Sequence, residues 1–182
     1  MAVRRVLPFD PIAEAHRNWS SAGWTEAADG MAFVTSIMRV QQICTAWTDD
    51  VLAPFDLTFA RFEALRLLAF TRRGRLPLGK IGERLQVHPA SVTNVVDRLE
   101  RNGLVRRVPH PTDGRTTLAA ITPKGRRLVA TATDALNTKV FQQTGLGDRQ
   151  LRDLVATLAE LREAAGDFDV PTGEFEPLDG DV

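Results

Sequence analysis

The side chains best suited to bind an anion are three arginines within residues 103–125. Arg106 and Arg107 are adjacent near the start of this segment, and Arg115 follows Asp113 by two positions. A guanidinium presents several donors in one plane and matches the oxygens of a phosphate. A carboxylate two residues away could brace the guanidinium of Arg115 so that it projects from the chain. These residues predict a surface that binds a phosphate-bearing polyanion.

The segment that carries these arginines has the pattern of two short strands folded back on each other over residues 104–121. Five turn-forming residues occupy the predicted tip: His110, Pro111, Thr112, Asp113 and Gly114. Such residues favour the tight backbone bends that join antiparallel strands. A basic hairpin straight after a helix resembles a wing that grips DNA. The alternative is an ordinary exposed turn with a local ion pair, typically worth under ~1 kcal/mol.

A second set of candidate contacts precedes the hairpin, on a helix predicted over residues 89–102. Its valines and Leu99 recur at helical spacing, so Val92, Val95 or Val96 would face the core. Four polar side chains then remain for another surface: Ser91, Thr93, Asn94 and Arg98. Asparagine pairs bidentately with adenine, and arginine with guanine or phosphate. With the turn at 86–88 and the short helix before it, this is a helix-turn-helix pattern, although many helical hairpins share it.

The charge distribution supports a polyanionic partner despite a formal net charge of zero. Residues 61–127 hold 15 Lys+Arg and 5 Asp+Glu, whereas the remainder holds 8 Lys+Arg and 18 Asp+Glu. An excess of +10 in one part of a protein is typical of a surface that faces nucleic acid. A solvated charged surface without a partner is the alternative.

Composition argues against several other classes of protein. The 182 residues suggest one domain with extensions, no run approaches the ~20 apolar residues of a membrane span, and the N-terminus lacks a secretory signal. The lone Cys44 excludes an intramolecular disulfide and a cysteine-based zinc site. The histidines are widely spaced, so no metal site is expected. These features favour a cytoplasmic protein with no membrane partner.

We expect no enzymatic activity. The sequence has no glycine-rich phosphate loop, no recognisable acid–base pair, and no histidine at a recognisable spacing from Cys44. Three glutamates within the basic region, Glu63, Glu83 and Glu100, are interpreted as solvent-facing helix charges.

Long helices are predicted on both sides of the basic centre. From residue 29 to 53 apolar residues recur at steps of 4, 3, 4, 3 and 4, as in a coiled-coil seam: Phe33, Ile37, Val40, Cys44, Trp47 and Val51. Thr58 and Thr122 are predicted N-caps of the helices that follow them. The seam and the apolar stripes after residue 122 exceed what the small centre can bury, so we predict a homodimer. A monomeric helical core is the alternative.

The predicted fold class is therefore mainly α, a winged helix-turn-helix with a small β-hairpin wing and long N- and C-terminal dimerisation helices. Residues 1–27 form an N-terminal extension, and the main domain covers residues 28–166. Within it, the winged helix-turn-helix spans about 57–122 and the dimerisation helices about 29–53 and 123–166. Residues 167–182 hold six acidic residues and no basic one, and we expect them to be disordered.

Residues 57–125 resemble the MarR family of bacterial winged-helix regulators. The resemblance rests on LGKIGERLQVHPASVTNVVDRLERNGLVRR, then HPTDGR at the wing, then ITPKG at the next helix. It implies a regulator of transcription, a repressor in our interpretation, that binds a palindromic double-stranded DNA operator as a homodimer. Arg115 would be its minor-groove arginine, Asp113 the bracing acid, and Arg106 and Arg107 contacts to phosphate. Ser91, Thr93, Asn94 and Arg98 would lie on its recognition helix.

The resemblance also implies control by a small aromatic or phenolic effector and no other cofactor. The effector would bind between the dimer base and the winged lobe, where four aromatic residues are expected: Trp47, Phe55, Phe59 and Phe62. Aromatic residues at helical spacing also occur simply as core. Since the chain has no tyrosine, Cys44 is expected to be inert packing rather than a peroxide sensor. The alternative function is a winged-helix protein-interaction module without specific DNA reading.

Overall fold

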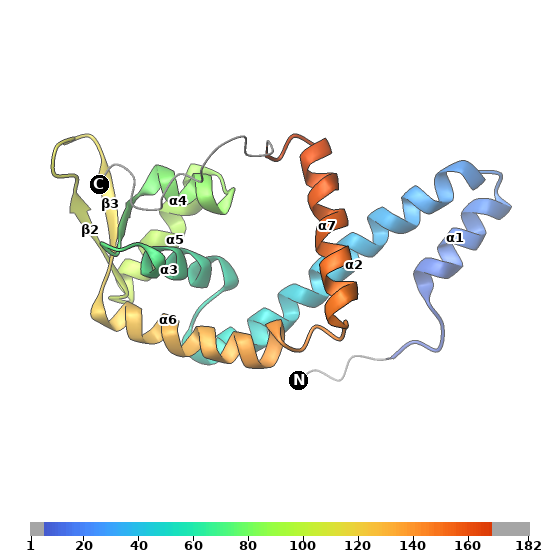
Figure 1. The fold of residues 1–182 in the computed structure, drawn as a ribbon, viewed down its shortest axis with the longest axis horizontal. Coiled ribbons are helices and arrows are strands. Elements are labelled where there is room, and N and C mark those ends of the chain that lie inside the picture. Colours follow the sequence, from blue (N-terminus) through green and yellow to red (C-terminus); the bar gives the residue numbers. More distant parts are fainter. Residues whose placement is uncertain (1–5, 169–182) are drawn as a thin grey trace.

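The computed structural model describes residues 6–168, which form mostly helices around one small sheet (Figure 1). The α-helices are α1 Pro11–Ser21, α2 Thr25–Leu52, α3 Phe59–Phe70, α4 Leu78–Leu85, α5 Pro89–Arg101, α6 Pro123–Leu136 and α7 Asp148–Ala164. The strands are β1 Arg75–Pro77, β2 Val105–Pro109 and β3 Thr117–Ile121. A 3-10 turn, Ala53–Phe55, follows α2, and a π-helical turn, Asn137–Phe141, continues α6. This architecture confirms the predicted fold class.

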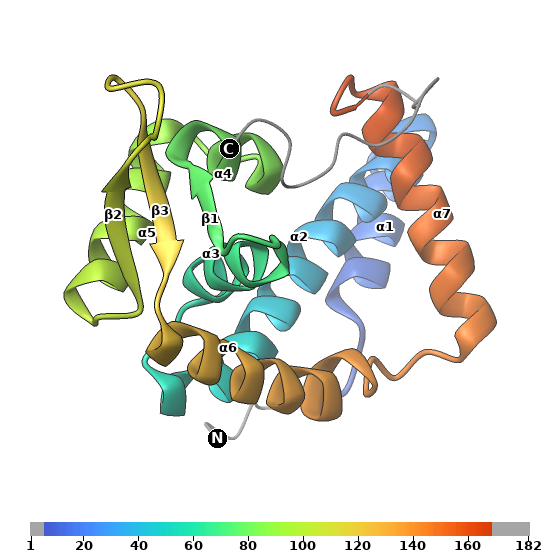
Figure 2. The ribbon, with the colours of Figure 1, turned by 60° about the vertical axis from the view of Figure 1, so that its left-hand side comes forward.

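The three strands and helices α3 to α5 make a compact head (Figure 2). The sheet is antiparallel with the order β1-β3-β2, and Arg75 pairs with Ala120 while Val105 pairs with Ile121. The buried side of the sheet and the three helices share one core, which includes Leu65, Leu68, Val96 and Leu99. The hairpin predicted from the sequence is present as β2 and β3.

Two helix starts in this part of the chain confirm the predicted caps. The Thr58 hydroxyl accepts a hydrogen bond from the main-chain N–H of Arg61, and the Thr122 hydroxyl accepts one from Gly125 at 3.0 Å. Pro123 occupies the first turn of α6, where a missing N–H has no cost. The caps therefore fix where α3 leaves the turn after α2 and where α6 leaves the sheet.

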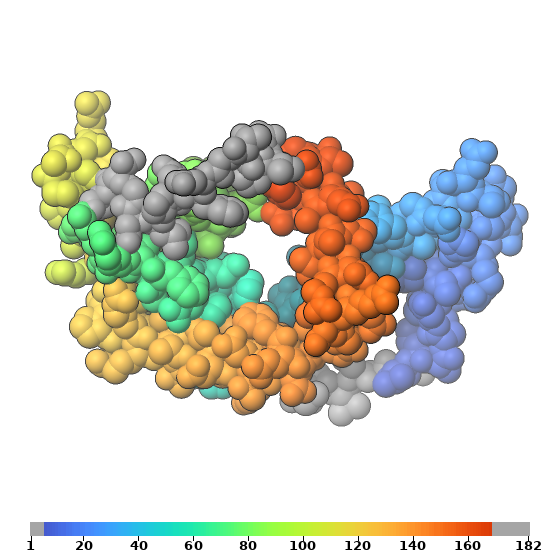
Figure 3. All heavy atoms as spheres, viewed as in Figure 1, coloured from blue at the N-terminus to red at the C-terminus, as the bar shows by residue number. Residues whose placement is uncertain are grey.

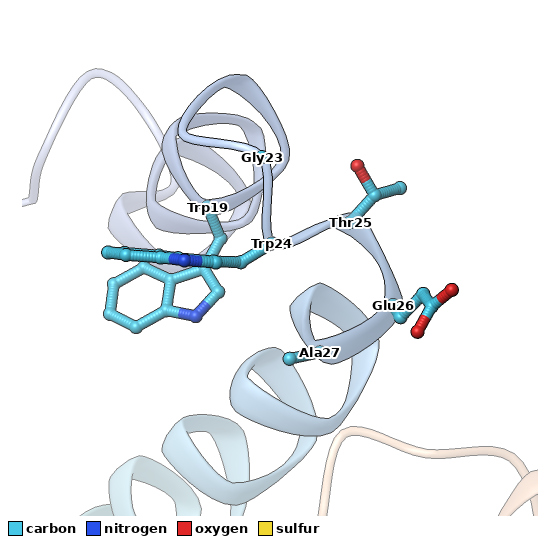
Figure 4. A pocket seen from close by; sticks show the side chains of 6 residues that line it. All are labelled: Trp19, Gly23, Trp24, Thr25, Glu26 and Ala27. Atoms are coloured by element: carbon cyan, nitrogen blue, oxygen red, sulfur yellow. The ribbon is translucent and has the colours of Figure 1, made fainter.

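Residues 1–27, expected only as an N-terminal extension, contain helix α1. Asp10 caps α1 through a 2.9 Å hydrogen bond to the N–H of Ile12. Helix α1 packs along α2, burying Ala28, and the rings of Trp19 and Trp24 meet at the turn with centroids 5.4 Å apart (Figure 4). The first part of the chain thus forms a helical hairpin with α2.

The outer faces of α2 and α7 are unusually apolar. The seam residues Phe33, Ile37, Val40 and Trp47 are 38–51% exposed, and α7 leaves Leu154, Val155 and Leu161 exposed while burying no residue. Cys44, expected to be packed in the seam, is also exposed in the single chain. Packing within the single chain therefore leaves apolar side chains of both helices exposed to solvent.

Helix α6 runs along the base of the molecule and joins the head to α7 (Figure 1). Figure 3 shows an open gap between the head and α7. No helix in residues 6–168 is long and apolar enough to cross a bilayer.

Candidate nucleic-acid interface

Helix α5 divides its side chains between the core and an exposed polar face. Val92, Val96 and Leu99 are buried against α3 and α4, so they confirm the predicted inner stripe. The four predicted contact residues, Ser91, Thr93, Asn94 and Arg98, are all exposed. His88 caps the helix by accepting the N–H of Ala90 through Nδ1 at 3.2 Å. A rigid helix therefore presents small polar groups near its N-terminus and a guanidinium further along.

Arg107 does not lie free at the base of the wing. Its guanidinium donates to the Asp97 carboxylate at 2.6 Å and to Glu100 at 2.5 Å, and its main-chain N–H donates to Glu100 at 2.8 Å. Both acids are on α5, three residues apart. These bonds fasten β2 to α5, and the phosphate contact expected of Arg107 stays a prediction.

The same contacts change the pKa of Glu100, which was expected to be a solvent-facing helix charge. The main-chain N–H of Arg107, followed by its guanidinium, lowers the pKa of Glu100 below the usual value. Glu63, also expected to face solvent, has its pKa shifted in the opposite direction. It lies beside an apolar crevice between α3, α4 and α5, and burial raises the pKa of its carboxyl.

Asp113 holds the main chain of the wing tip. Its carboxylate accepts the hydroxyl of Thr116 at 2.7 Å and the main-chain N–H of Arg115 at 3.0 Å, and these two hydrogen bonds lower the pKa of Asp113. His110 Nδ1 also accepts the N–H of Asp113 at 3.1 Å. The hydrogen bond that joins Asp113 to Arg115 thus goes to the main chain of Arg115, and the bracing of its guanidinium stays a prediction. The acid shapes the turn that carries Arg115, and the side chain of Arg115 remains exposed.

The remaining basic candidates are all exposed. Arg106 is exposed on β2, Arg98 is exposed on α5, and Arg115 is exposed beyond the end of β3. Because Arg107 joins β2 to α5, the wing and the polar helix face are held in one arrangement. Chemically, this surface can donate many hydrogen bonds to an anion and offers amide and hydroxyl groups beside them.

The start of α6 is pressed against the chain that links α5 to β2. The Thr122 hydroxyl donates to the carbonyl of Gly103 at 2.8 Å, and its main-chain N–H donates to the carbonyl of Leu104 at 3.0 Å. A Cβ on Gly125 would lie 2.2 Å from the carbonyl oxygen of Leu104. The threonine and the glycine of the ITPKG segment therefore allow one close joint between the head and α6.

The four aromatic residues expected around an effector differ in burial. Phe62 is 5% exposed within the core, and its ring stacks on that of Phe59 at 6.1 Å. Phe55 and Phe59 pack against the same core, whereas Trp47 is exposed on α2. Among residues 6–168, no group of three or more His, Cys, Asp or Glu side chains is placed to hold a metal ion.

Comparisons with known proteins agree with this geometry. The family model for the MarR family matches residues 57–117. The structure of Sco5413, a MarR family transcriptional regulator from Streptomyces coelicolor, is 52% identical, with a TM-score of 0.71 over 78% of this chain and 99% of that chain. An uncharacterised HTH-type transcriptional regulator of Mycobacterium bovis is 32% identical over 61% of this chain and 76% of its own length.

CouR of Rhodococcus jostii RHA1 is a third relative, with two informative solved structures. The complex of this transcriptional repressor with a 23-mer DNA duplex is 26% identical, with a TM-score of 0.64 over 69% of this chain and 89% of that chain. The chain in its complex with p-coumaroyl-CoA is 25% identical to this chain, with a TM-score of 0.62 over 74% of this chain and 92% of that chain. The head, the wing and the identity to these relatives lead to one conclusion: this chain belongs to the MarR family of transcriptional regulators.

Proposed function

We propose that this protein is a repressor that binds a palindromic double-stranded DNA operator as a homodimer and releases it when a small aromatic effector binds. The observation that carries the proposal is the fastening of β2 to α5 by Arg107. It holds a basic wing and a polar helix face in one arrangement. A helix in the major groove and a wing arginine in the minor groove together read a short half-site.

Within this proposal the exposed residues have distinct roles. Asn94 would pair with a base edge, with Ser91 and Thr93 beside it, while Arg98 and Arg106 would contact phosphate or guanine. Arg115 would enter the minor groove, whose negative potential is strongest where it is narrow. The DNA-bound structure of CouR supports this use of the shared fold.

A homodimer is proposed because the outer faces of α2 and α7 need cover. Their exposed residues include Phe33, Val34, Met38, Val40 and Trp47 on α2, and Leu154, Val155 and Leu161 on α7. A contiguous apolar surface of this kind marks a protein–protein contact. Two heads related by a two-fold axis would meet half-sites about one helical turn, ~34–36 Å, apart.

The effector site is proposed at the junction of α2 and α3, near Trp47, Phe55 and Phe59. Phe62 belongs to the core, and its ring stacks on that of Phe59. CouR, which binds p-coumaroyl-CoA, shows that a relative with this fold accommodates an aromatic acyl group. An effector would lower DNA affinity by binding better to a dimer whose head spacing does not match the operator.

The test is selection of bound duplexes from a random library, followed by affinity measurements on the selected site. We expect Arg115→Ala to weaken binding on every duplex, whereas Asn94→Ala should mainly relax preference at one position, by about 1–3 kcal/mol. Affinity should fall steeply with salt, with a log–log slope of about −0.9 per phosphate contacted.

The second candidate, a winged-helix protein-interaction module, is disfavoured by the polar exposed face of α5 and the basic wing. Salt-dependent elution from heparin or nonspecific DNA separates the two. A chain that passes through both columns unretained, and selects no duplex, would leave the interaction module as the better account.

A further inference from the structure

Two arginines from opposite edges of the sheet flank the same residue of the central strand. In the order β1-β3-β2, Arg75 of β1 pairs with Ala120 of β3, and Ala120 pairs with Arg106 of β2. Residues paired across neighbouring strands place their side chains on the same face of a sheet. Arg75, Ala120 and Arg106 therefore form one row, here called the outer arginine row, across strands that lie side by side in Figure 2.

The outer arginine row lies on the face of the sheet that points away from the core of the head. The adjacent row contains Leu76 and Ala119, which both belong to that core. Because side chains alternate along a strand, Arg75 and Arg106 lie on the opposite face.

No carboxylate within the strands balances the two guanidinium groups. The strand residues of this face include no acid: Arg75, Pro77, Arg106, Val108, Leu118 and Ala120. Within residues 6–168 no ion pair reaches Arg75 or Arg106, whereas Arg107 on the other face meets two carboxylates. Two positive charges set beside each other without an acid favour the binding of an anion between them.

Arg75 also holds a donor that the described part of the chain leaves unsatisfied. Its side chain is half-buried, and its Nε is buried without a hydrogen-bond partner among those residues. A buried donor without a partner costs free energy, and a ligand that accepts a hydrogen bond from it removes that cost. Arg106, in contrast, is exposed. One arginine of the row is thus partly enclosed, and the other is open to solvent.

The spacing of the row suits a phosphate group. Neighbouring strands lie about 4.8 Å apart, so the Cα atoms of Arg75 and Arg106 are about 10 Å apart. Ala120 carries only a methyl group between them, which leaves room for both long side chains to turn toward one point. A guanidinium matches the oxygens of a phosphate, and two guanidinium groups can bind opposite sides of it.

This position is separate from the tip of the wing. Ala120 is five residues from Arg115 in the chain, which corresponds to at most ~17 Å along an extended strand. The outer arginine row would therefore contact a different phosphate from any that Arg115 meets.

We propose that Arg75 and Arg106 together bind one phosphate group on the outer face of the sheet. The phosphate comes either from the DNA backbone beside a half-site or from a free phosphate ester, since both present the same oxygens. The DNA source rests on the proposed DNA-binding function, whereas the phosphate site itself does not. A phosphate bound there would link β1 to β2, two strands that do not pair with each other.

The first test titrates the full chain with pyrophosphate and uses no DNA. We expect pyrophosphate to shift the Nε–H resonances of Arg75 and Arg106 and to raise the thermal unfolding midpoint. Arg75→Gln and Arg106→Gln should each weaken this binding about five-fold or more. Arg127→Gln, which removes an exposed arginine of α6 outside the row, is the matched control and should bind pyrophosphate as the parent does.

The second test measures affinity for duplexes over a range of salt concentrations. If the DNA backbone supplies the phosphate, Arg75→Gln should weaken specific and nonspecific duplexes by the same factor. It should also reduce the log–log salt slope by about 0.9 relative to Arg127→Gln. Loss of pyrophosphate binding with unchanged DNA affinity would support the site and identify a free phosphate ester as its ligand.

The two tests together can overturn the proposal. If Arg75→Gln matches the Arg127→Gln control in both pyrophosphate binding and DNA affinity, the outer arginine row is not a phosphate site. If the parent binds no duplex while pyrophosphate binding depends on both arginines of the row, the proposed DNA-binding function fails and the phosphate site stands.

Discussion

The adjacent arginines of β2 show how one position along a strand changes what a residue does. Side chains alternate across a strand, so Arg106 and Arg107 point to opposite sides. Arg106 is exposed, whereas Arg107 reaches the carboxylates of Asp97 and Glu100 on α5. One arginine remains available for a partner, and the other holds the surface together.

We predict that Arg107→Ala destabilises the protein by about 1–2 kcal/mol. The loss leaves two neighbouring carboxylates without their shared donor, while their partial exposure to solvent limits the cost. Thermal unfolding followed by circular dichroism should show a lower midpoint, by roughly 3 °C per kcal/mol for a chain of this size.

Arg106→Ala is the matched control for this change. It should leave the unfolding midpoint unchanged, because Arg106 is the adjacent residue of β2 and its exposed side chain points to the other side of the strand. Equal midpoints for the two variants would mean that the contact of Arg107 with α5 contributes nothing to stability.

The sequence revealed the type of these residues but not their partners. Two adjacent arginines at the base of a wing suggest two phosphate contacts, and only the register of β2 against β3 separates them. A usable signal was present in Asp97 and Glu100, since acids three residues apart share one face of a helix. Asp113 was recognised as an organising acid, but its target is the main chain, which a spacing of two residues does not distinguish from a guanidinium.

At the scale of elements, the joint between the head and α6 depends on a glycine. We predict that Gly125→Ala destabilises the fold by about 1–3 kcal/mol, because the new Cβ meets the Leu104 carbonyl oxygen and α6 must shift away. Chemical denaturation gives the free energy of unfolding. Gly114→Ala serves as the control, since a Cβ there has no neighbour within 4 Å. If the Gly125→Ala protein has the same free energy of unfolding as the parent, α6 can move away from Leu104 without cost, and the prediction is wrong.

Most elements could be predicted because their ends carry strong local signals. Thr58 and Thr122 cap helices, and Pro89 and Pro123 begin them, so the boundaries follow from backbone chemistry. Helix α1 was missed although Asp10 and Pro11 form the same kind of start. Helix α1 packs on α2, and no local pattern in the sequence contains that contact.

At the scale of the whole molecule, the uncovered face of α2 gives the clearest prediction. Val40→Lys should dissociate the proposed dimer, because a lysine in a buried seam has no partner, while the isolated chain already exposes this position. Sedimentation velocity at micromolar concentration measures the assembly state. Gln42→Lys, an exposed position on the opposite side of α2, should remain dimeric. A monomeric parent protein would refute the dimer outright.

Because Arg107 attaches β2 to α5, the distance between the wing and the reading helix is fixed within each head. In the proposed complex, one base pair inserted inside a half-site would move the wing's target ~3.4 Å along the DNA axis, and the head could not stretch to follow it. Natural binding sites for this protein should therefore keep the length of each half-site constant.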